Sequence, residues 1–102
     1  MNKIIWEDIK NDKSDLLYLL KLIIPVYRVK EMHTKLLEAN KLYEMILIDK
    51  TEYTKDALLA LYHIMMDCAN YLSLYGDYYG DLDDAKLAIN LINKISLKFK
   101  NE

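Results

Sequence analysis

The sequence predicts an all-α protein, an antiparallel bundle of four to five helices, on three observations. Only two glycines and one proline occur among 102 residues, whereas a β-sandwich or barrel needs a turn signal every ~8–12 residues. Hydrophobic residues make up 53% of the chain and charged residues 29%, which is typical of a folded globular protein. Apolar residues also recur at helical spacing. We therefore expect helix over at least about two-thirds of the chain.

The length suits one domain with a single core. Without an internal repeat or a linker-like stretch, we predict one helical-bundle domain over residues 1–102. The single cysteine, Cys68, precludes an intrachain disulfide and favours a reducing, cytoplasmic location. Acidic residues precede the first apolar run, unlike in a signal peptide. Both long apolar runs are too short or too polar to span a membrane.

The first half of the chain predicts three helical segments. A short helix is expected over residues 4–10, with an apolar side that includes Trp6, and Ser14 is a suitable N-cap for the next helix. Pro25 then removes one helical hydrogen bond and clashes with the preceding turn. Because the apolar spacing continues past it, either two helices meet at Pro25 or one helix kinks there. The apolar spacing predicts the clearest helix over residues 26–48.

The second half predicts two helices. Thr54 can cap the third helix, which covers residues 57–75 and carries one polar stripe of Asp56, His63, Asp67 and Asn70. Gly76 suits its C-terminal end. Asp81 is expected to cap the last helix.

One short motif resembles an enzyme signature. Arg28 and His33, in the string RVKEMH, have the R-x4-H spacing of the HEPN ribonucleases, small helical dimers in which such a pair cleaves RNA. The resemblance implies an RNA-cleaving activity that uses Arg28 and His33. The alternative interpretation is a solvated helix surface.

Other polar groups favour structural roles. His63 and Asp67 could act as a general base with its orienting carboxylate, or as two metal ligands, but the remaining ligands of a metal site are missing. We interpret them as a structural polar stripe. Cys68 has no cation one turn away to lower its pKa and is expected to be a buried small hydrophobe. No cofactor or metal is predicted.

The stretch over residues 71–84 is rich in tyrosine and aspartate. The chain has nine tyrosines and one phenylalanine, and tyrosine is enriched at protein interfaces because its ring is buried while its hydroxyl stays wet. A calcium loop does not fit this stretch. The predicted partner-binding residues are Tyr71, Tyr75, Asp77, Tyr78, Tyr79 and Asp81. The alternative is a bundle end sealed by half-buried tyrosines.

These observations predict a small non-enzymatic protein that binds another protein, as an inhibitor, an immunity protein or an accessory regulator does. The HEPN-like ribonuclease is the enzymatic alternative. A DNA-binding regulator is a further one, because the last helix is locally basic through Lys86, Lys94, Lys98 and Lys100. The formal net charge of −2 and the single arginine make nucleic acid an unfavourable partner.

The third helix also predicts a homodimer. Its polar stripe is narrow for a surface helix, and pairing through a two-fold axis would cover the apolar remainder. Ala57, Ala60 and Ala69 would permit close helix approach. The competing arrangement is a monomer in which the N-terminal segment with Trp6 covers this surface.

We expect Arg28→Ala and His33→Ala to change the free energy of unfolding by less than ~0.5 kcal/mol, because exposed helix positions contribute little. Chemical denaturation measures this change. A ribonuclease activity of the pure protein that disappears in both variants would instead establish the enzymatic alternative.

Overall fold

The computed structural model describes residues 3–74 and 82–100, and in this part the predicted all-α bundle is confirmed. The four helices contain 21, 15, 20 and 19 residues, more than two-thirds of the chain. The order of elements is β1 (Lys3–Ile5), α1 (Ile9–Val29), α2 (His33–Leu47), β2 (Glu52–Thr54), α3 (Lys55–Leu74) and α4 (Leu82–Lys100).

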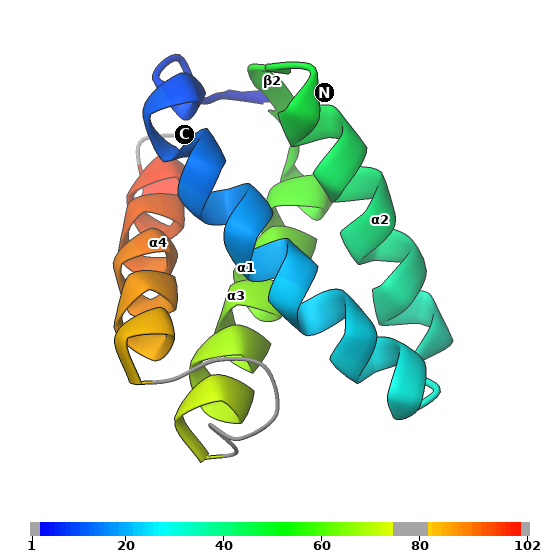
Figure 1. Ribbon diagram of the computed structural model, residues 1–102. Coiled ribbons are helices and arrows are strands. Elements are labelled where there is room, and N and C mark those ends of the chain that lie inside the picture. Colours follow the sequence, from blue (N-terminus) through cyan, green and yellow to red (C-terminus); the bar gives the residue numbers. More distant parts are fainter. Residues whose placement is uncertain (1–2, 75–81, 101–102) are drawn as a thin grey trace.

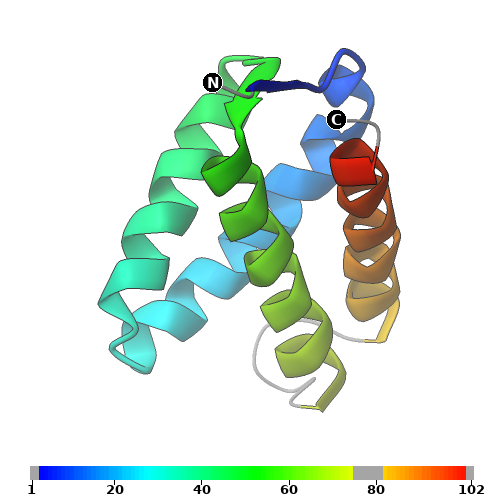
Figure 2. The same cartoon turned by 180° about the vertical axis from the view of Figure 1, so that it is seen from behind.

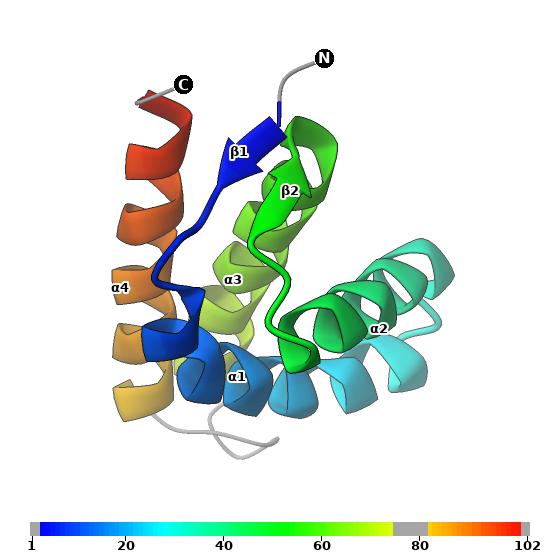
Figure 3. The ribbon, with the colours of Figure 1, turned by 90° about the horizontal axis from the view of Figure 1, so that it is seen from above.

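Two helical hairpins pack together. One is formed by α1 and α2 and the other by α3 and α4, and α1 crosses α3 diagonally (Figure 1). Seen from the end that carries the strands, α3 lies in the middle, with α4 on one side and α2 on the other (Figure 3). The core therefore forms mainly between α1, α3 and α4, whereas α2 packs chiefly on α1.

The N-terminal segment is a strand, so the predicted helix over residues 4–10 is wrong. β1 pairs antiparallel with β2, placing Ile4 opposite Tyr53, and both side chains are buried. Trp6 follows, fully buried, with its ring edge-on to that of Tyr53. Helix α1 begins at Ile9, which places the predicted cap Ser14 inside it. Pairing with a segment about fifty residues away overrides the local helical spacing.

Pro25 does not divide the chain into two helices, since α1 continues through it to Val29. The single helix expected over 26–48 is wrong in its continuity, because residues 26–29 end α1, the chain turns over residues 30–32 and α2 begins at His33. Glu31 has a left-handed φ of 57°. Its amide donates to the Arg28 carbonyl at 3.2 Å, and the Met32 amide donates to that of Tyr27 at 2.9 Å. This is the Schellman arrangement, made without the glycine that normally reveals it.

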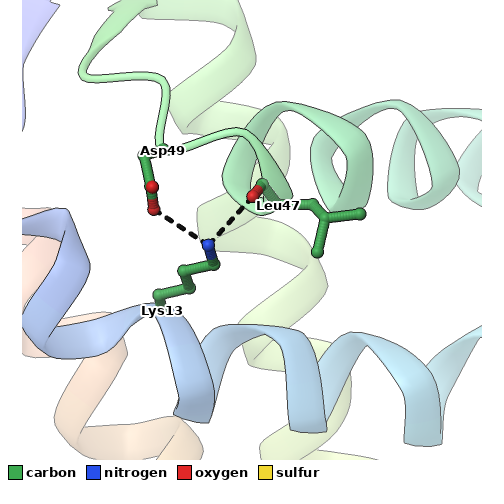
Figure 4. A network of polar contacts seen from close by, with 3 residues as sticks. All are labelled: Lys13, Leu47 and Asp49. Carbon is green, nitrogen blue, oxygen red and sulfur yellow. Dashed lines mark hydrogen bonds and ion pairs between the residues drawn. The ribbon is translucent and has the colours of Figure 1, made fainter.

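Helix α2 ends in the same way. Asp49 has a φ of 60°, and the amides of Asp49 and Lys50 donate to the carbonyls of Ile46 and Met45. The Lys13 ammonium reaches this end from α1, 2.9 Å from both the Asp49 carboxylate and the Leu47 carbonyl (Figure 4). A cation at a helix C-terminus is favourable, so this contact holds α1 and α2 together.

The start of α3 agrees with the sequence. The Ala57 amide donates to the Thr54 hydroxyl at 3.1 Å, which confirms Thr54 as the cap. Leu58, Leu61, Ile64 and Met65 of α3 are buried in the core. The predicted end at Gly76 and the predicted cap Asp81 lie outside the described residues.

We expect Glu31→Gly to raise the free energy of unfolding by about 1 kcal/mol, because glycine adopts the left-handed conformation without a Cβ penalty. Urea unfolding measures the gain. Glu31→Ala is the matched control, since alanine retains the Cβ and should bring no comparable increase. Equal stability of the glycine and alanine variants would contradict this explanation of the turn.

Candidate functional site: a groove between α2 and α3

A groove runs between α2 and α3. It consists of two adjoining hollows of about 450 and 230 Å³, which share Glu38 from α2 with Asp56 and Ala60 from α3. Figure 2 views the molecule from this side, with α2 and α3 in front and α1 passing behind them. The groove forms because α2 packs on α1 rather than closely along α3.

The walls combine apolar and charged side chains. On α3, Leu59 and Met66 line the larger hollow, with 43% and 39% of their surfaces exposed. Leu42 and Met45 of α2 line the smaller hollow. Small Ala60 borders both hollows. Such a mixed, elongated surface is suited to side chains of another macromolecule.

One end of the groove is held by a carboxylate that joins three helices. Asp67 of α3 accepts a hydrogen bond of 2.6 Å from the Tyr27 hydroxyl of α1. The Lys35 ammonium of α2 lies 2.7 Å from the same Asp67 oxygen. Lys35 also stands 5.9 Å from the centre of the Tyr27 ring. The predicted structural role of the polar stripe is therefore realised at Asp67 through contacts with α1 and α2.

The surroundings of this contact raise the pKa values of two buried groups, the Tyr27 phenol and the Cys68 thiol. Burial, reinforced by the hydrogen bond to Asp67, raises the pKa of the Tyr27 phenol well above its ordinary value. The prediction of a buried Cys68 is confirmed, and burial likewise raises the pKa of its thiol. Neither group is prepared to act as a nucleophile or base near neutral pH.

His63 is exposed on the wall of the groove, with its ring edge-on to that of Tyr62 at 5.6 Å. Within residues 3–74 and 82–100, no group of three or more histidine, cysteine, aspartate or glutamate side chains is placed to hold a metal ion.

The predicted partner-binding tyrosines fall largely beyond the described structure. Tyr71 is half-buried against the core, and the Lys30 ammonium lies 5.3 Å from the centre of its ring. The other predicted residues lie outside the described residues: Tyr75, Asp77, Tyr78, Tyr79 and Asp81. The candidate surface that the structure defines is thus a different one, the α2–α3 groove.

The residues of the two alternative functions are also placed. Arg28 lies in the last turn of α1 and His33 begins α2, both exposed, on either side of the turn over residues 30–32. On α4, Lys94 pairs with buried Asp12 at 2.5 Å. Lys98 lies 3.5 Å from Asp8. Two of the four lysines of the predicted basic helix therefore have carboxylate partners.

The sequence revealed only one wall of the groove. The predicted polar stripe on α3 supplies Asp56, His63, Asp67 and Asn70, all of which line the larger hollow. The facing wall, with Glu38 and Lys41, could not be predicted from the sequence, because its position depends on where α1 ends and α2 turns back.

No protein family, curated protein or solved structure matches the chain. Among the helices of the described part, none combines the length and the hydropathy needed to traverse a lipid bilayer.

We expect the free energy of unfolding to fall as the pH rises above about 9. Burial raises the pKa of Tyr27, Tyr53 and Cys68 above the ordinary values of 10.0 for tyrosine and 9.0 for cysteine. The pKa of Tyr53 reaches about 12. The unfolded chain therefore loses these protons first. The contribution of these protons to stability is complete below about pH 9 and falls by at most ~1.4 kcal/mol per pH unit for each group. The contribution of Tyr53 is lost as the pH rises through about 12.

Urea unfolding between pH 8 and pH 11 measures this dependence, and Tyr27→Phe and Tyr53→Phe should each make it shallower. A stability that stays constant to pH 11 would contradict the burial of these protons.

Proposed function

We propose that the protein acts by binding another protein, and that a helix of the partner lies in the α2–α3 groove. The observation that carries the proposal is the groove itself, with an apolar edge of Leu59 and Met66 and charged residues from both walls. Recognition of an amphipathic helix by a groove uses such a combination, with apolar anchors and a polar rim.

The dimensions support a helical occupant. The α3 wall runs from Thr54 to Asn70, which at 1.5 Å per residue corresponds to ~24 Å. A helix of about four turns would fill that length. An inhibitor, an immunity protein or an accessory regulator would bind in this manner, and the single cysteine supports the cytoplasm as the place of binding.

The charge distribution on α4 supports protein binding over DNA binding. The hydrogen bond between buried Tyr27 and partly buried Asp67, at one end of the groove, holds α1 and α3 together. On α4, Lys94 and Lys98 are already paired with carboxylates, which reduces the positive charge available to a phosphate backbone.

A displayed library of helix-constrained peptides tests the proposal. We expect selection on the purified protein to yield amphipathic peptides whose binding weakens at least about tenfold in Ala60→Trp, because Ala60 borders both hollows. Leu37→Ala is the control, since Leu37 is an exposed residue of α2 outside the groove. Circular dichroism checks that both variants fold. Selected peptides that bind Ala60→Trp as tightly as the wild type would refute the groove as the binding surface.

A further inference from the structure

Helix α4 carries an exposed apolar stripe. Leu82, Ile89 and Leu97 expose 61%, 48% and 56% of their surfaces. At 100° per residue these three side chains lie within one narrow arc of the helix, with Lys86 and Asn93 between them. By the same spacing, the charged residues in this arc are Lys86 and Lys100, both cations. The stripe therefore consists of spaced apolar side chains and carries a positive charge.

The α2–α3 groove has the complementary charge at its centre. Glu38 and Asp56 stand on opposite walls and border both hollows. Two cations of α2 border the groove: Lys35 already pairs with Asp67, and Lys41 lines the smaller hollow. A cation that enters between the two hollows would therefore meet two carboxylates, while apolar side chains one turn before and after it would reach the hollows.

The lengths also agree. From Leu82 to Leu97 the stripe extends ~22 Å along the helix axis, against ~24 Å for the α3 wall of the groove. Within the stripe, Leu82 lies four residues before Lys86 and Ile89 three residues after it. This spacing matches two apolar anchors on either side of a central cation.

We propose that α4 of a second copy of this chain occupies the groove, with Lys86 between Glu38 and Asp56 and with Leu82 and Ile89 in the two hollows. The inference rests on the proposed function of the groove as a site for a helix. Because α4 and α2 lie on opposite sides of α3 (Figures 1 and 2), the stripe and the groove of one copy engage different neighbours. The association is head-to-tail, unlike the two-fold pairing of third helices predicted above.

Light scattering after size exclusion, over micromolar to millimolar concentrations, tests the arrangement. The chain has a mass of 12.1 kDa, and the wild-type mass should rise with concentration past that of two copies. Ile89→Asp removes an anchor of the stripe and Ala60→Trp fills the groove, so each variant alone should stay at the mass of one chain, its association weakened at least about tenfold. Circular dichroism confirms the folding of both.

The decisive sample is the mixture of these two variants. Ile89→Asp retains a groove and Ala60→Trp retains a stripe, so the mixture should form a pair that stops at twice the mass of one chain. If Ala60→Trp fails to fold, the double substitution of Glu38→Lys and Asp56→Lys replaces it as the groove variant.

A wild type that stays at one chain mass throughout would overturn the inference, and so would an assembly that Ile89→Asp leaves intact. The proposed function has a separate test: it is refuted if peptides selected on the protein bind Ala60→Trp as tightly as they bind the wild type.

Discussion

The Asp67 carboxylate is the contact on which the arrangement of the helices most depends. It lies on the central helix α3 and holds the Tyr27 hydroxyl of α1 and the Lys35 ammonium of α2 on one oxygen. Hydrogen bonds to a charged acceptor in a partly buried setting are among the stronger ones in proteins. The direction in which α2 leaves α1 is thereby tied to the position of α3. The groove is the space that this three-helix contact leaves open.

The helices could be predicted from the sequence because helical spacing is a local property. The pattern over α3 and the hydroxyl of Thr54 identified that helix and its start. The turn at Glu31 could not be predicted, because a left-handed glutamate carries no signal comparable to a glycine. Nor could β1, whose partner strand lies beyond two helices. Local pattern failed where a distant contact or an unusual backbone conformation decided the outcome.

The candidate site was predictable to the same extent. Asp56, His63, Asp67 and Asn70 share one face of a single helix, so their alignment could be read directly. Their relation to Glu38 depends on the packing of α2, which follows from the Schellman turn after α1. The partners of Asp67 also could not be predicted from the spacing of residues along its own helix. Its neighbour one turn away, His63, suggested a catalytic pair, while the fold supplies partners from two other helices.

The pairing of β1 with β2 has a topological consequence. Between the two strands lie all of α1 and α2, so the register of Ile4 against Tyr53 turns the first half of the chain into a closed ring. Closing a ring of this size costs entropy that grows only slowly with its length, and the buried Trp6 and Tyr53 rings seal the joint. During synthesis, β1 must wait unpaired until β2 has left the ribosome. β1 can therefore reach its place only after all of α1 and α2 has been made.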